Sequence, residues 1–296
     1  MRRSSVKKIG ATKVALLTTM ASLLLGGCSA SSSGNPILDL LSDFMPPSPK
    51  EAALDLFDIY DADKRRRAVA LIAASPFGHE EPYVRTYRVM LGRGSEGQVL
   101  PVDDDATVRA TCAKALGMHG TVEDAELIAP LLKDKVSYVR WQAAQALQRI
   151  HNPIAVQPLI ETLRMDEDSD VRQACAAALG QYPQPLVYDT LVGALSDPNY
   201  GVVQAAHQSL RTLTGQQFTS QGEAWIKWGS ENRSTLFIDQ QMYQFLPYQK
   251  PASIIDKVRF WKEREEVQPK LPIGKRPLEE EDVIAVEAMT PTDEEE

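Results

Sequence analysis

The chain has 296 residues, of which 43% are hydrophobic, and its 40 acidic residues outnumber its 32 lysines and arginines. Such a chain is long enough to form one or two domains with a hydrophobic core. The acidic balance disfavours binding to nucleic acid or to anionic lipid headgroups, because both carry negative charge themselves.

The first 27 residues predict an export signal rather than part of a fold. Five lysines and arginines flank the start, an apolar run extends from Val14 to Leu25, and Gly26 and Gly27 follow. This order of basic, apolar and small residues is typical of a secretory signal peptide. The apolar run is too short to span a bilayer, which needs about 20 residues. Residues 1–27 contain five of the 32 basic residues and none of the 40 acidic ones. Removal of this segment therefore leaves a chain with a net charge of −13.

The four residues Leu25-Gly26-Gly27-Cys28 resemble the lipobox of bacterial lipoproteins. The resemblance implies that the Cys28 thiol receives diacylglycerol and becomes the mature N-terminus. Ser29 after the cysteine implies sorting to the outer membrane, facing the periplasm. Two or more acyl chains, at about 0.8 kcal/mol per buried methylene, would hold the protein on a membrane. The alternative is an ordinary secretory signal in which Cys28 is incidental.

Residues 28–50 are rich in serine, glycine and proline, which predicts a flexible tether after the lipid. An internal repeat of about 31 residues follows. Four segments align without gaps, beginning at the valines Val108, Val139, Val171 and Val202. Small residues recur four and seven positions after each valine and leucine recurs at the eighth, so they share one face of a helix.

A second amphipathic helix is predicted before three of these segments, at Val122–Lys133, Pro153–Arg164 and Pro185–Leu195. Polar residues at the turns are expected to cap the following helices, namely Asp105, Asp168 or Ser169, and Asn199. Each repeat is therefore a predicted helical hairpin. Such hairpins bury both of their apolar faces only by stacking on one another.

The motif D-x-x-V-R-x-x-A-x-x-A-L-G occurs at Asp105–Gly117 and Asp168–Gly180, with a cysteine at its first alanine position. It resembles the HEAT repeat, particularly the bacterial repeats related to phycobilin lyases. The resemblance covers roughly residues 51–213. It implies an all-α fold, a right-handed α-solenoid of about five hairpins over residues 51–217, and an earlier hairpin around residues 61–74.

The repeat pattern ends after Leu213. Residues 218–268 predict a capping helix at Gly222–Trp228, whose tryptophans would cover the last hairpin, and then an aromatic extension with one helix at Ala252–Arg264. Residues 269–296 are rich in proline and then in acidic residues, which predicts a largely irregular, disordered tail.

Two repeated positions are candidates for structural roles. Cys112 and Cys175 lie two repeats apart, which places them roughly 18–20 Å from each other for helices packed 8–10 Å apart. A disulfide needs Cα atoms within about 7 Å, so both cysteines are expected to be buried and free. Arg109, Arg140 and Arg172 form a column, and we expect a structural ladder in which they pair with carboxylates such as Asp134, Asp166 or Asp168. The alternative is an anion-binding ridge.

Positions two and six after each valine are predicted to point away from the core. They include Trp141, Gln145, Gln173, Gln204 and Gln208, together with Ala110, Lys114 and Ala177. An exposed Trp141 among amide side chains is a candidate anchor for a protein partner. The alternative is that Trp141 packs on a neighbouring loop or on the C-terminal segment. The four histidines are not expected to converge on a metal.

No motif of a catalytic, phosphate-binding or zinc site is present in the sequence, and no cofactor or metal is expected. The sequence therefore favours a non-enzymatic protein-interaction scaffold in the cell envelope. Two alternatives remain: a bilin lyase or chaperone, which only the phycobilin-lyase resemblance implies, and a purely structural envelope component whose C-terminal segment packs on the solenoid.

Overall fold

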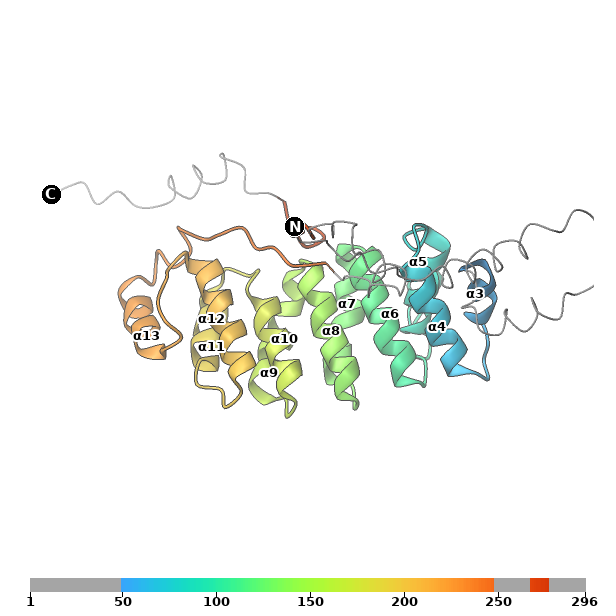
Figure 1. Cartoon of the computed structure of the whole chain (residues 1–296), viewed down its shortest axis with the longest axis horizontal. Coiled ribbons are helices and arrows are strands. Elements are labelled where there is room, and N and C mark those ends of the chain that lie inside the picture. Colours follow the sequence, from blue (N-terminus) through green and yellow to red (C-terminus); the bar gives the residue numbers. More distant parts are fainter. Residues whose placement is uncertain (1–48, 248–266, 277–296) are drawn as a thin grey trace, which may run out of the picture. The chain divides into compact units, whose positions relative to one another are not determined.

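The structure is a computed structural model, and it describes residues 49–247 and 267–276, all within the unit Ser48–Glu296. In this part of the chain there is no β-strand, only isolated bridges. The helices pack as five pairs that lie side by side in chain order (Figure 1). Helical hairpins stacked in this way form an α-solenoid.

The first helices of the pairs carry more interruptions than the second helices. They are α3 (Pro49–Asp55), α5 (Glu81–Met90), α7 (Ala125–Ile128), α9 (Val156–Met165) and α11 (Pro185–Ala194). The second helices are α4 (Ala62–Ala73), α6 (Ala106–His119), α8 (Ser137–Arg149), α10 (Ser169–Leu179) and α12 (Tyr200–Thr214). Short 3₁₀ turns are η1 (Ser95–Gly97), η2 (Val122–Asp124), η3 (Ala129–Lys133) and η4 (Pro153–Ala155).

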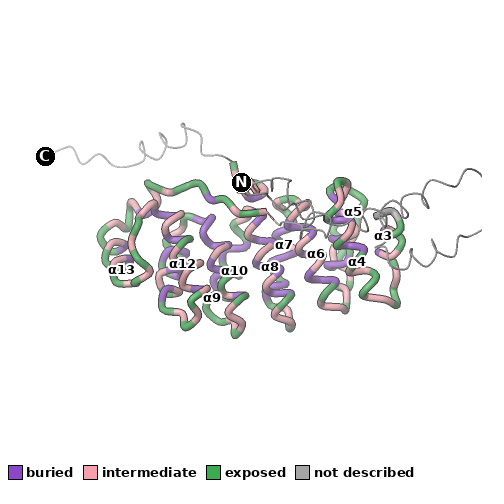
Figure 2. Tube along the Cα trace, in the orientation of Figure 1, coloured by how far each residue is buried: buried purple, intermediate pink, exposed green. Residues whose placement is uncertain are grey.

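The repeated positions occupy equivalent places in the stack. The leading valines of α6, α8, α10 and α12 are all fully buried, and Figure 2 shows buried residues recurring along the stacked helices. Small residues allow the second helices to approach closely. A Cβ atom added at Gly117 would lie 2.9 Å from the Cα atom of Ala146, and one at Gly180 would lie 2.6 Å from the hydroxyl of Ser209. The recurrence of small side chains is therefore what lets α6 pack on α8, and α10 on α12.

Side chains cap the second helices where the polar turns predicted them. The Asp105 carboxylate accepts hydrogen bonds from the amides of Thr107 and Val108 at the start of α6. Asp168 caps α10 and Asn199 caps α12 in the same way. These acceptors satisfy amides that have no partner within the helix, and the cap typically contributes about 1 kcal/mol.

The prediction of one continuous helix over residues 122–133 is wrong. Residues Val122–Lys133 form η2, the four-residue α7 and η3 instead of a single α-helix. Pro130 has no amide hydrogen to donate, and its ring clashes with the carbonyl of the residue four positions earlier, so an α-helix cannot run through it. The stretch still packs along α8.

Helix α13 (Gly222–Glu231) packs against α11 and closes the stack. The Trp225 side chain is fully buried, and its indole nitrogen donates to the Thr219 carbonyl over 2.8 Å. Tyr188 of α11 donates to the Trp225 carbonyl over 2.7 Å. Trp228 is half-buried beside the Tyr188 ring.

The predicted disorder from residue 269 is wrong for residues 269–276. Together with residues 241–245, residues 267–276 form what we call the C-terminal strap, which binds near the carboxyl ends of α8, α10 and α12 (orange and red in Figure 1). Ile273 donates to the Arg149 carbonyl and accepts from the His151 amide over 2.7 and 2.8 Å. These backbone bonds, and the burial of Tyr243, hold a segment whose composition alone predicted no order. The predicted helix Ala252–Arg264 and the tail beyond residue 276 lie outside the described residues.

Candidate interaction surface

The arginine column forms a ladder of largely buried ion pairs between neighbouring repeats. The Arg109 guanidinium donates through Nε and Nη2 to both carboxylate oxygens of Asp134, over 2.8 and 3.1 Å. Arg140 does the same to Asp166 over 2.6 and 2.8 Å. Arg172 binds Asp197 in the same two-pronged way, over 2.8 and 3.0 Å. Each pair joins a second helix to the loop before the next second helix.

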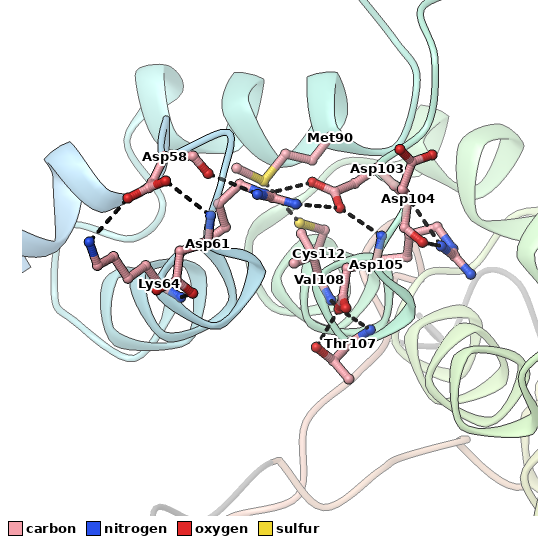
Figure 3. Close-up of polar contacts among 12 residues, drawn as sticks. Asp58, Asp61, Lys64, Met90, Asp103, Asp104, Asp105, Thr107, Val108 and Cys112 are labelled. Carbon is pink, nitrogen blue, oxygen red and sulfur yellow. Dashed lines mark hydrogen bonds and ion pairs between the residues drawn. The ribbon is translucent and has the colours of Figure 1, made fainter.

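The remaining donors of each guanidinium bind the loop before its own helix. Nη1 of Arg109 donates to the carbonyls of Asp103 and Asp104, each over 2.9 Å, and Nη1 of Arg140 donates to the Asp134 carbonyl over 3.0 Å. Figure 3 shows the first of these loops, where Asp103, Asp104 and Asp105 precede α6. Because the guanidinium donors are used within the fold, the column offers little to an external anion.

The ladder has one rung more than the sequence predicted. Arg65 of α4 binds both carboxylate oxygens of Asp103 over 2.9 and 3.0 Å, and its Nη1 donates to the Asp58 carbonyl over 2.8 Å. Asp197, at the other end, was also not predicted as a partner. A signal for both was present, because Asp103, Asp134 and Asp166 each precede a ladder arginine by six residues. Asp197 also precedes the equivalent position by six residues, but that position holds Val203 instead of an arginine.

The electrostatics of the ladder favour its charged forms. The hydrogen bond from Arg172 holds the pKa of Asp197 below its usual value, against an opposing effect of burial. Burial is the largest influence on Asp134, but hydrogen bonds from Arg109 and from the Val136 amide outweigh it, so its pKa is also lowered. Hydrogen bonds to Asp103, Asp166 and Asp197 raise the pKa of Arg65, Arg140 and Arg172, respectively.

The glutamines and Trp141 lie on α8, α10 and α12, which pack on one another in that order. Trp141 is half-buried and stacks on Tyr138, with ring centroids 5.8 Å apart and planes inclined by 27°. Trp141 packs against the edge of the core and is only partly exposed, and its neighbour Tyr138 is the more exposed ring at 48%. Sequence reasoning missed Tyr138, although it precedes Trp141 by one helical turn.

The five predicted surface residues differ in exposure. Gln173 and Gln208 are exposed, whereas Gln145 and Gln204 are half-buried. Gln145 follows Trp141 by four residues and Gln208 follows Gln204 by four, so each pair lies on one helix face. Together with Tyr138, these five residues are called the amide-aromatic row. The row begins at α8, because Ala110, the equivalent position of α6, is fully buried.

The two described cysteines are free and buried. Burial raises the pKa of both the Cys112 and the Cys175 thiol, which disfavours the reactive thiolate. Among the described residues, no three histidine, cysteine, aspartate or glutamate side chains are grouped so that they could hold a metal ion. No helix in that part of the chain is long and apolar enough to cross a bilayer. Cys28 lies outside the described residues.

Comparisons with known proteins agree with the helical repeats. Residues 97–148 and 125–211 match the HEAT repeat family. No curated protein matches the chain. Among solved structures, YibA of Escherichia coli is similar with a TM-score of 0.48 and 16% identity, over 79% of this chain and 85% of that one. The complex of CpcE and CpcF of phycocyanin lyase from Nostoc sp. PCC7120 is similar with a TM-score of 0.35 and 18% identity, over 63% of this chain and 81% of that one.

Proposed function

We propose that this chain, whose residues 97–211 match HEAT repeats, is a protein-interaction scaffold without catalytic activity, held at the cell envelope by a lipid on Cys28. The observation that carries the proposal is the amide-aromatic row. Its side chains lie across three stacked helices and belong neither to the arginine ladder nor to the interior of the core. A surface of this kind spans several repeats, as binding surfaces of solenoid proteins do.

The row suits an uncharged stretch of polypeptide. Amide side chains donate and accept hydrogen bonds at once, so Gln173 and Gln208 can bind the amides and carbonyls of a partner backbone. The stacked Tyr138 and Trp141 offer a rigid apolar surface at one end of the row. Aromatic anchors of this kind dominate the binding energy of many protein interfaces.

Affinity purification from detergent-solubilised envelope, followed by mass spectrometry, tests the scaffold role. We expect a reproducible protein partner that is lost with Trp141→Ala and weakened with Gln173→Ala, an exposed substitution that leaves the core intact. Ile226→Ala on α13, where the side chain is 62% exposed, is the matched control and should retain the partner. A partner retained by both row variants would remove the row from the proposal.

The lipid anchor has its own test. Residues 25–28 resemble a lipobox and follow a short apolar run, which supports acylation of Cys28. Mass measurement of the mature N-terminal peptide should show diacylglycerol on Cys28 and no residues before it. An unmodified N-terminus at or near Cys28 would contradict the anchor and leave an ordinary exported protein.

A structural envelope component is a second candidate, because the C-terminal strap packs back on the stack. Gln148 of α8 donates to the Tyr243 hydroxyl, which in turn donates to the Ala177 carbonyl, over 3.0 and 2.7 Å. In that case the strap completes the molecule and no soluble partner is needed. Crosslinking in intact cells separates the two candidates, since only the scaffold should form adducts with a second protein.

A further inference from the structure

The first helix pair exposes a cluster of large apolar side chains at the N-terminal end of the stack. Leu54 of α3 is 80% exposed, and Phe57, Ile59 and Tyr60 of the following turn are 70%, 76% and 94% exposed. We call these four residues the apolar edge. A groove of about 380 Å³ adjoins it and is lined in part by Phe57, Ile59 and Val89. Exposed apolar clusters of this kind usually mark a contact surface.

The charges beside the apolar edge neutralise one another. Lys64 pairs with Asp58 over 3.1 Å, and Arg66 pairs with Asp63 over 3.2 Å. Arg65 belongs to the ladder through Asp103, and the remaining charged side chains nearby include Arg67, Asp55 and Asp61. Residues 51–67 carry five acidic and four basic side chains, so the charge beside the edge is nearly balanced and attracts neither a strongly acidic nor a strongly basic surface. Its chemistry fits a surface that is apolar within and close to neutral outside, as a zwitterionic phospholipid bilayer is.

The place of the edge in the chain brings it close to the proposed lipid anchor. Only twenty residues separate Cys28 from Pro49, the first residue of α3. Even a fully extended chain of that length reaches at most about 75 Å. An acyl chain on Cys28 therefore keeps the apolar edge within reach of the bilayer. A tether of this length also gives the edge a high effective concentration at the membrane, which favours even a weak contact between the two.

We propose that the apolar edge inserts into the headgroup region of the bilayer that holds the lipid anchor, so that the first helix pair lies on the membrane. The proposal rests on the acylation of Cys28 under the proposed function. Phenylalanine, tyrosine and leucine are the residue types that partition to this interface, because the rings and methyl groups reach below the headgroups while polar atoms stay wet. The amide-aromatic row begins at α8, two helix pairs further along the stack, and remains available to a protein.

Flotation of the full mature chain with phosphatidylcholine vesicles tests the edge without help from the lipid. The chain carries Cys28→Ala in every sample, so no acyl chain contributes. The edge variant adds Leu54→Ser, Phe57→Ser and Tyr60→Ser, and the matched control adds Ile226→Ser, Ile238→Ser and Leu246→Ser, which are exposed apolar positions far along the chain. We expect the edge variant to lose on the order of tenfold or more in vesicle partitioning, and the control to lose little.

The two proposals fail in different ways. An unmodified Cys28 in the native protein contradicts the anchor, whereas the flotation of the Cys28→Ala chain still decides the edge. Equal partitioning of the edge variant and its parent overturns the membrane contact. If the edge variant partitions as its parent does but loses a co-purified protein, the edge binds protein, and the proposal is equally overturned. Unchanged circular dichroism shows that both triple variants remain folded.

Discussion

Ladder arginines bind two neighbouring repeats at once, so the loss of one guanidinium affects the fold far more than its single charge suggests. The side chains of Arg140 and Asp166 are only 11% and 5% exposed. Without its partner the Asp166 carboxylate would be a charge removed from water and uncompensated. Breaking such a pair from one side typically costs about 3–5 kcal/mol.

Arg140→Gln should therefore lower the free energy of unfolding by roughly 3–5 kcal/mol. Arg233→Gln is the matched control, because Arg233 also binds a carboxylate with two hydrogen bonds, but the Arg233 and Asp189 side chains are about half exposed. Surface pairs contribute about 0–1 kcal/mol. Urea unfolding followed by circular dichroism measures both variants. Equal losses would mean that burial of the ladder does not matter.

The ladder also predicts loss of stability in acid. Because Arg172 lowers the pKa of Asp197 in the folded state, the unfolded chain binds more protons on that carboxyl. The stabilisation is fully present above the unfolded pKa, which is about 3.9, and it is lost as the pH falls through the lower folded pKa. Unfolding free energies measured between about pH 6 and about pH 2.5 should fall less steeply for Arg172→Gln than for the parent. Parallel curves would contradict the assignment.

At the residue scale, the sequence could predict the arginines because each occupies the same place in an aligned segment. Three of the four carboxylate partners also follow a fixed six-residue spacing. The sequence could not predict the exposure of Tyr138 or the partial burial of Trp141 in this way. An aromatic residue occurs at these two positions in only one repeat, so the repeat pattern says nothing about how it packs. How a single aromatic side chain turns depends on its neighbours in the adjacent helix.

At the scale of the element, the close approach of second helices depends on the absence of side chains at a few positions. Gly117→Ala would place a Cβ atom 2.9 Å from the backbone of α8, so the two helices must move apart. Overpacking of this kind costs typically 1–3 kcal/mol. Gly193→Ala in α11 is the control, since nothing lies within 4 Å of its added Cβ atom.

We expect Gly117→Ala to lower the melting temperature and Gly193→Ala to leave it unchanged or raise it slightly, because alanine favours the helix by up to about 1 kcal/mol. Thermal unfolding measures both. A Gly117→Ala variant that melts at or above the temperature of its parent, as Gly193→Ala is expected to do, would show that helix propensity, and not close packing, controls this part of the fold.

The C-terminal strap depends on a few hydrogen bonds at the ends of the second helices. Tyr243→Phe keeps the buried ring but removes the hydroxyl that joins Gln148 to the Ala177 carbonyl, at a cost of about 0.5–1.5 kcal/mol. Hydrogen exchange should then become faster at the strap amides, Ile273 among them, while the amides of α6 stay as they were. Tyr60→Phe, at a 94% exposed tyrosine, should change neither. Unchanged protection in Tyr243→Phe would mean that the strap is held by other contacts.

The helices and the strap differ in how far the sequence reveals them. The second helices carry a face of small residues at helical spacing, and their positions follow from it. Pro130 marks where a first helix is interrupted, a signal that the amphipathic pattern around it obscures. The strap has no period, since its order comes from long-range backbone bonds such as that of Ile273 with Arg149. Contacts of that kind exist only once the stack has formed.

At the scale of the whole molecule, five helix pairs divide the available tasks among different surfaces. The ladder joins the repeats, α13 and the strap cover the carboxyl-terminal end and one edge, and the apolar edge lies nearest to Cys28 along the chain. The amide-aromatic row spans α8, α10 and α12 and belongs neither to the ladder nor to the strap. The sequence predicts an element where its residue pattern repeats. The solenoid was therefore predictable, whereas the order of the C-terminal strap was not.

Site-specific photo-crosslinking in intact cells tests the scaffold role most directly. A photoreactive residue at Gln173, in the amide-aromatic row, is compared with one at Met165, which is 83% exposed at the end of α9 outside the row. A scaffold that binds a protein through the row should give a discrete crosslinked species of higher mass from position 173 and none from position 165. The absence of any adduct from positions 173, 204 and 208, in cells where the protein is folded and exported, would contradict it.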